Sequence, residues 1–71
     1  MKISYDTEAD ALYIGLTEGE ISETREVLPG VILDISKKGH LLGIEVLHVK
    51  ARYPLKDIAH IDIKMPLELA E

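Results

Sequence analysis

The segment that most restricts the fold is residues 41–49, because apolar side chains occupy both alternating positions of this stretch. One parity holds Leu42, Ile44 and Val46, and the other holds Leu41, Leu47 and Val49. Successive side chains of a β-strand point to opposite faces of its sheet. A strand that is apolar on both faces lies in the centre of a sheet, or another element covers its second face. The sequence therefore predicts a sheet with residues 41–49 inside it.

Alternating apolar and polar residues predict further strands over residues 2–5, 11–16, 21–28, 31–35 and 61–65. Turn signals separate these runs: Pro29-Gly30 fits a type II turn, and residues 36–39 end in Gly39, as in a type I turn with a glycine bulge. The carboxylate of Asp6 is expected to cap the polar run that follows it. Gly15 and Gly43, inside strand patterns, indicate bulges or close backbone contacts.

Pro54 fits the first position of a short helix over residues 54–60. The expected fold class is therefore α+β, mainly β. It is an antiparallel meander of about five strands with one short helix near the C-terminus, in a single domain over residues 1–71.

The chain has no cysteine, so it forms no disulfide and no thiolate metal site. In a domain of 71 residues the hydrophobic gain and the cost in chain entropy nearly cancel. We therefore expect a homo-oligomer, which adds burial. The alternative is that the C-terminal segment covers the second face of residues 41–49 within one chain. The absence of cysteine and of a signal peptide favours a cytoplasmic protein.

Charge is unevenly distributed along the chain. The net charge is −5, and residues 1–36 alone carry −6. An acidic half repels phosphate backbones, which argues against direct binding of nucleic acid. No apolar run reaches the length of a membrane span, so no membrane partner is expected. The acidic half suits a basic protein partner, with the candidate contact surface at Glu18, Glu20, Glu23 and Glu26.

The alternating carboxylates Asp6, Glu8 and Asp10 resemble the start of a calcium loop. An EF-hand needs glycine at the sixth position of its loop and glutamate at the twelfth, where this chain has Ala11 and Thr17. Capping of a turn is the favoured interpretation, and a weak cation site is the alternative.

Other residues also lack a catalytic arrangement. The three histidines, His40, His48 and His60, are too dispersed for one metal site, and no serine lies in a nucleophile motif. We expect no catalytic residue, no metal and no cofactor. The alternative is an enzyme or small-ligand binder whose site forms at an oligomer interface.

Three stretches in order resemble the YuzE-like family of small prokaryotic proteins, a domain of unknown function. They are Tyr5-Asp6-Thr7-Glu8-Ala9-Asp10-Ala11-Leu12-Tyr13-Ile14, then Glu26-Val27-x-Pro29-Gly30-Val31-Ile32-x-Asp34, then Gly39-x-Leu41-x-Gly43-Ile44-Glu45-Val46-Leu47. The resemblance implies a small β-rich cytoplasmic protein with no established activity or cofactor. It also suggests an antitoxin-like partner of a small basic protein, as considered for some relatives.

The residues of this signature receive a structural interpretation. They are Tyr5, Asp6, Asp10, Tyr13, Pro29, Gly30 and Gly39. Asp6 and Asp10 bracket the turn between the first two strands, and Tyr13 is expected to contact residues near Tyr5 across the strands or to cover a partner.

Overall fold

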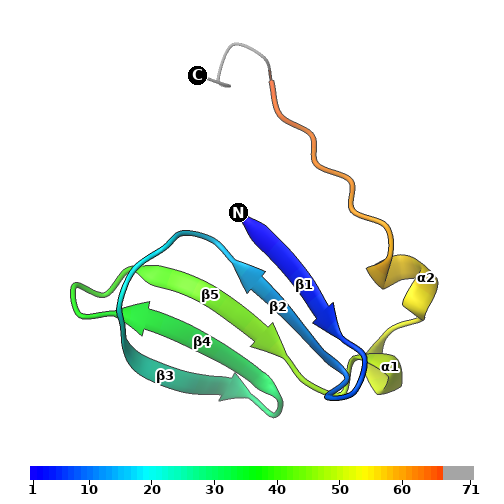
Figure 1. Cartoon of the computed structure of the whole chain (residues 1–71), viewed down its shortest axis with the longest axis horizontal. Coiled ribbons are helices and arrows are strands. Elements are labelled where there is room, and N and C mark those ends of the chain that lie inside the picture. Colours follow the sequence, from blue (N-terminus) through cyan, green and yellow to red (C-terminus); the bar gives the residue numbers. More distant parts are fainter. Residues whose placement is uncertain (67–71) are drawn as a thin grey trace.

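A computed structural model describes residues 1–66, which form one antiparallel sheet and two short helices (Figure 1). The strands are β1 (Lys2–Asp6), β2 (Ala11–Gly15), β3 (Ile21–Leu28), β4 (Val31–Ser36) and β5 (Leu41–Val46). The helices are α1 (Val49–Arg52) and α2 (Leu55–Ile58). The predicted class, mainly β with antiparallel strands and a helical C-terminal part, is confirmed. Residues 67–71 of the predicted domain lie outside the described residues.

The strand order across the sheet is β1-β2-β5-β4-β3. β1 and β2 form one hairpin, and β3, β4 and β5 form a meander that joins the hairpin through pairing of β2 with β5. The prediction of a meander throughout was wrong at one step, because the chain passes from β2 to the far edge of the sheet before it returns. β5 is central, as its apolar residues on both parities predict.

The C-terminal part differs most from the sequence expectation. The strand expected to continue to residue 49 ends at Val46, because His48 has the left-handed backbone conformation (φ 54°) from which α1 begins. The helix expected over 54–60 is shorter, Leu55–Ile58. Residues 61–65 form no strand, since no strand of the described chain lies beside them to pair with. Neither helix within residues 1–66 is long and apolar enough to cross a membrane.

The predicted turns are confirmed. The Asp6 carboxylate accepts hydrogen bonds from the amides of Glu8 (2.9 Å) and Ala9 (3.1 Å), which holds the turn between β1 and β2. Gly30 (φ 77°) and Gly39 (φ 85°) both have the positive φ that their turns require. The Gly39 amide donates to the Ser36 carbonyl at 2.9 Å, which closes the turn between β4 and β5.

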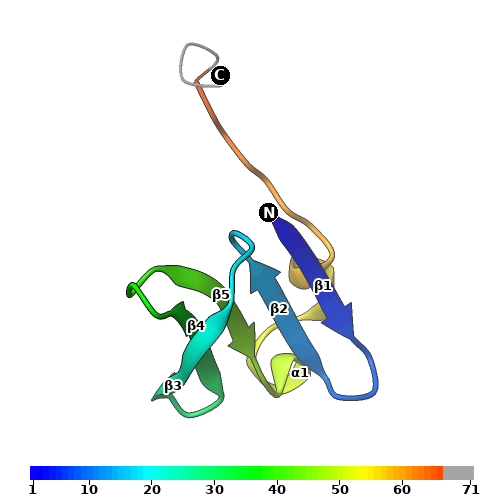
Figure 2. The same ribbon diagram turned by 60° about the vertical axis from the view of Figure 1, so that its left-hand side comes forward.

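Pairing across the strands defines two faces, because directly opposite residues point to the same side. The apolar face consists of Ile3, Tyr5, Leu12, Ile14, Val31, Leu33, Ile44 and Val46. The polar face includes Lys2, Ser4, Tyr13, Thr24, Glu26, Asp34 and Glu45. Both helices lie on one side of the strands (Figure 2).

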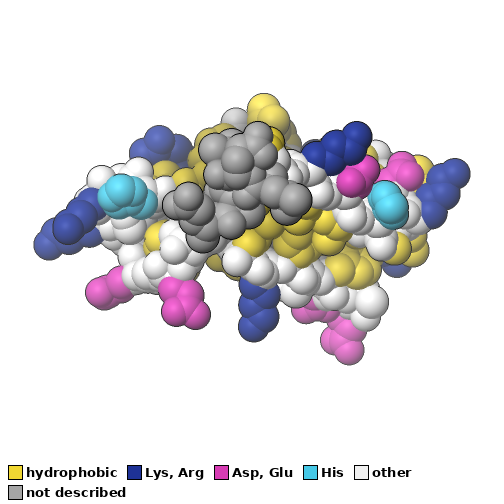
Figure 3. Space-filling model, turned by 90° about the horizontal axis from the view of Figure 1, so that it is seen from above, with side chains coloured by type: hydrophobic (Ala, Val, Ile, Leu, Met, Phe, Trp, Pro, Cys, Tyr) yellow, Lys and Arg dark blue, Asp and Glu magenta, His cyan; other side chains and the backbone are white. Residues whose placement is uncertain are grey.

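The buried core is small. Among the described hydrophobic residues, only Leu42 and Val49 are buried, and every member of the apolar face remains half-exposed. From above, the molecule is flat, and hydrophobic side chains reach its surface between charged ones (Figure 3). A single sheet with two one-turn helices therefore covers its own apolar face incompletely.

Candidate functional site

The signature residues at the turn between β1 and β2 form a connected set of hydrogen bonds. The Tyr5 hydroxyl donates to the Asp10 carboxylate at 2.6 Å, and the same carboxylate accepts from the Lys50 amide at 3.2 Å. The Asp10 carbonyl also accepts from the Val49 amide at 3.2 Å. Asp10 thus joins the hairpin to the first turn of α1. Since Tyr5 belongs to the apolar face, this connection places α1 beside that face.

Asp10 has φ 52°, a conformation that aspartate tolerates better than most residues. The Tyr5 hydroxyl bonded to it holds the pKa of the Asp10 carboxyl below its ordinary value, against the opposing effect of burial. The Lys50 amide adds to the lowering. The same hydrogen bond raises the pKa of the Tyr5 phenol. Both groups are held in the protonation states that preserve the bond at neutral pH.

Tyr13 lies flat across the polar face and not beside Tyr5, which is on the other face. Its hydroxyl donates to the Asp34 carboxylate at 3.0 Å and so reaches from β2 over β5 to β4. Gly43 makes this possible, because a Cβ built there would meet the Tyr13 ring at 2.6 Å from Cζ. Gly15 also contacts the ring, with its Cβ position 3.3 Å from Cε2. The nearest neighbour of both strand glycines is therefore the Tyr13 side chain, whereas the sequence indicated bulges or close backbone contacts.

The hydrogen bond to Asp34 raises the pKa of the Tyr13 phenol, and burial and the charges of Asp34 and Glu45 add to the effect. A phenol with a raised pKa stays protonated near neutral pH. Tyr13 is thus a hydrogen-bond donor in this arrangement and a poor general base.

Pro29 and Gly30 form the turn between β3 and β4. This turn contacts Arg52, the last residue of α1, and Leu47, which lies just before α1. The Arg52 guanidinium donates to the carbonyls of Pro29 and of Leu47, the latter at 2.8 Å. The Leu47 amide donates to the Gly30 carbonyl at 2.8 Å. Residues of the signature therefore hold α1 at both ends, through Asp10 and through the Pro29 turn.

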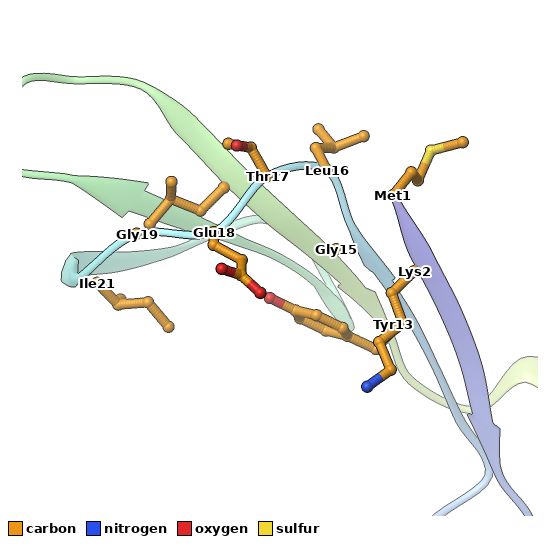
Figure 4. Close-up of a pocket in the computed structure, with 10 residues that line it drawn as sticks. Met1, Lys2, Tyr13, Gly15, Leu16, Thr17, Glu18, Gly19 and Ile21 are labelled. Atoms are coloured by element: carbon orange, nitrogen blue, oxygen red, sulfur yellow. The ribbon is translucent and has the colours of Figure 1, made fainter.

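An open groove of about 700 Å³ lies beside Tyr13 at the start of β1 and the end of β2. Within it, Lys2, Tyr13, Glu18 and Ile21 extend to one side of the ribbon, and Met1, Leu16 and Thr17 extend to the other (Figure 4). Asp6, Asp10 and the histidines do not line it. The groove offers one cation, one carboxylate and a phenol to a small molecule.

The four candidate carboxylates Glu18, Glu20, Glu23 and Glu26 lie along β3 and the loop before it, and all are exposed. β3 is an edge strand whose eight residues are all exposed. Glu23 pairs with Arg25 at 2.8 Å, and Lys37 lies near Glu20 in a hollow beside the loop. Glu20, Glu23 and Glu26 therefore lie at the β3 edge, whereas Glu18 lies in the groove beside Tyr13.

Candidate metal ligands do not gather in the described part of the chain. No three histidine, aspartate or glutamate side chains within residues 1–66 are placed to hold an ion. The oxygens of Asp6 and Asp10 accept hydrogen bonds from the protein itself. His40 and His60 are exposed outside the strands, and His48 precedes α1.

Sequence reasoning missed Asp34 and Arg52 as partners of the signature. The sequence did contain a sign of the Tyr13–Asp34 contact. Gly43 lies in the most central strand and leaves space for a large side chain from a neighbouring strand. The signal for Arg52 was absent, because its partners are backbone carbonyls far away in sequence.

Comparison with known proteins gives one relationship. Searches of the curated proteins and of the solved structures find no significant match. Residues 2–50 match the family described as "Protein of unknown function (DUF2283)". The match begins at β1 and ends within α1, so it contains the whole sheet together with the Tyr5–Asp10–Lys50 and Tyr13–Asp34 contacts. This chain belongs to the DUF2283 family of proteins of unknown function.

Proposed function

We propose that this protein is a non-catalytic interaction module that binds a basic protein partner along β3. The observation that carries the proposal is the acidic edge strand. β3 combines exposed carboxylates with exposed apolar side chains, Ile21, Val27 and Leu28, at 50%, 46% and 63% exposure. An edge strand offers unpaired backbone groups to an incoming extended segment, and its side chains select the partner.

The partner that fits this edge is a segment with alternating basic and apolar residues. Carboxylates at the rim attract it and accelerate association, while the apolar residues and backbone contacts provide affinity. An antitoxin-like role toward a small basic protein, in the cytoplasm, is the form of this proposal suggested by the resemblance to YuzE-like proteins. A small-ligand site in the groove beside Tyr13 is the alternative function.

The test compares two variants with equal charge change. One is Glu20→Gln/Glu26→Gln, which omits Glu23 because Arg25 already engages that carboxylate and Glu18 because it lines the groove beside Tyr13. The matched control is Glu8→Gln/Asp57→Asn, at exposed positions outside β3 and its loop. Each tagged protein is used to recover partners from native cell extract at low salt, and the recovered proteins are identified.

We expect the wild type and the control to recover the same basic protein and the β3 variant to lose it. Association with the purified partner should slow and become less dependent on salt in the β3 variant. Equal recovery by all three proteins, or recovery of no basic protein by the wild type, would contradict the proposal. Binding of a small molecule that is lost on changing Lys2 would instead support the alternative.

A further inference from the structure

The chain exposes more surface than a folded monomer of its size. It exposes 5890 Å², whereas area scaling gives about 4,400 Å² for a monomer of 7.9 kDa. The excess is roughly 1,500 Å². A standard protein interface removes about 800 Å² from each partner, and obligate homodimers remove more. The excess is therefore of the size that one dimer interface would bury.

Part of this surface belongs to the C-terminal arm, defined here as residues 60–66. The arm leaves α2 and leads away from the sheet in both views (Figures 1 and 2). Ile61, Ile63 and Met65 alternate with Asp62 and Lys64 and are 55%, 62% and 59% exposed. This is the pattern of a strand with one apolar side, and nothing within residues 1–66 covers that side.

The arm and the apolar face match in size and in chemistry. The seven residues of the arm span six steps of about 3.3 Å, or about 20 Å when extended, and a five-stranded sheet is about 19 Å across its strands. Laid across the apolar face, the arm would bury its three apolar side chains against the half-exposed residues around Ile44. Asp62 and Lys64 would stay in water on the outer side.

We propose that the protein is a homodimer in which the arm of each copy covers the apolar face of the other. A two-fold arrangement makes the exchange reciprocal, so that both arms are buried and both apolar faces are covered. The arm projects away from its own sheet, and the excess area has the magnitude of a dimer interface. These two observations favour a second copy over the arm's own chain as the occupant. The site is distinct from the acidic edge at β3.

The first test measures mass and affinity by sedimentation equilibrium. The arm variant Ile61→Thr/Ile63→Thr/Met65→Thr keeps strand propensity and removes apolar contact. The control Ile21→Thr/Val27→Thr/Leu55→Thr changes three side chains of similar exposure outside the arm.

We expect a wild-type mass of about twice that of one chain and a dimer dissociation constant raised roughly 100-fold in the arm variant. The control should remain within about 3-fold of the wild type. A wild type that stays monomeric at high micromolar concentration, or equal weakening by both variants, would overturn the proposal.

The second test uses the absence of native cysteine, which makes introduced thiols the only ones in the chain. Ile63→Cys in the arm and Ile44→Cys on the face are placed in separate copies, which are mixed and oxidised. We expect a disulfide between the two different chains. In the alternative outcome, mixed copies do not cross-link and the double variant Ile63→Cys/Ile44→Cys closes a disulfide within one chain. That result would show that the arm covers its own face and would overturn the exchange.

Discussion

Two tyrosine–aspartate hydrogen bonds occur in this small protein, one associated with each face of the sheet. Tyr5 and Asp10 are five residues apart and meet at 2.6 Å across a single turn. Tyr13 and Asp34 are 21 residues apart and meet at 3.0 Å across three strands. The first bond is local to the β1–β2 hairpin, and the same Asp10 carboxylate also accepts from the Lys50 amide of α1. The second exists only when β2, β5 and β4 are side by side, so it reports the strand order itself.

This difference separates two kinds of stabilisation. The Tyr5–Asp10 bond fixes a turn and needs little of the sheet around it. The Tyr13–Asp34 bond depends on an empty space above Gly43 and on correct placement of the central strand. Changes to the second bond should therefore affect the whole sheet, whereas changes to the first should act mainly through the charge of one carboxylate.

The largest effect is expected for Gly43→Ala. The new methyl group would overlap the Tyr13 ring, with Cζ at 2.6 Å, and would lie 3.2 Å from the Ile14 carbonyl oxygen. Displacing the ring also removes the bond to Asp34. We expect a loss of about 3 kcal/mol in the free energy of unfolding, measured with urea.

Gly39→Ala is the control for Gly43→Ala, because its Cβ would meet no atom within 4 Å and only its φ of 85° opposes the change. It should cost about 1 kcal/mol. Equal losses for the two variants would show that overlap with Tyr13 is not the cause.

A smaller effect is expected for Tyr13→Phe, which removes the hydroxyl and leaves the ring. The loss should be about 1 kcal/mol at neutral pH. Because folding raises the pKa of this phenol above 10.0, its contribution is complete below pH 10 and is lost as the pH rises through the folded value. Urea unfolding at several alkaline pH values should show a shallower loss of stability in the variant than in the wild type. Parallel curves would contradict this account.

The smallest effect is expected at the local bond and only in acid. Folding lowers the pKa of Asp10 below 3.8, so its contribution is present above that value and is lost as the pH falls through the folded value. Asp10→Asn keeps a residue that tolerates positive φ and removes the titration. Thermal unfolding between pH 5 and pH 2 should be less sensitive to pH in this variant. Tyr5→Phe should change the acid dependence in the same direction, because it removes the main cause of the lowered pKa.

The local features could be predicted from the sequence, whereas the contacts between residues far apart in the chain could not. The Asp6 cap and the Pro29-Gly30 turn were predictable, because capping and positive φ are properties of a few adjacent residues. Alternation also gave strand positions close to those observed, and it identified β5 as central.

Alternation states which face a residue occupies and not which strand is its neighbour. The pairing of β2 with β5 was therefore missed, and the Asp34 partner of Tyr13 was missed with it. The prediction of a strand over residues 61–65 was wrong for a related reason, because alternation does not show whether a neighbouring strand exists. Its pattern was real, but a strand needs a neighbour, and the described chain offers none there.

The position of β5 has a consequence for how the protein is made. Within residues 1–66, β5 is the last strand in sequence order and the middle strand of the sheet, flanked by β2 and β4. During synthesis the β1–β2 and β3–β4 hairpins can each close through local contacts, but nothing joins them until residues 41–46 have left the ribosome. Before β5 forms, both edges of each hairpin are unpaired. β5 then pairs with β2 of the first hairpin and with β4 of the second, and so joins the two. The continuous sheet therefore forms only after residues 41–46 have emerged, later than either of the hairpins that it joins.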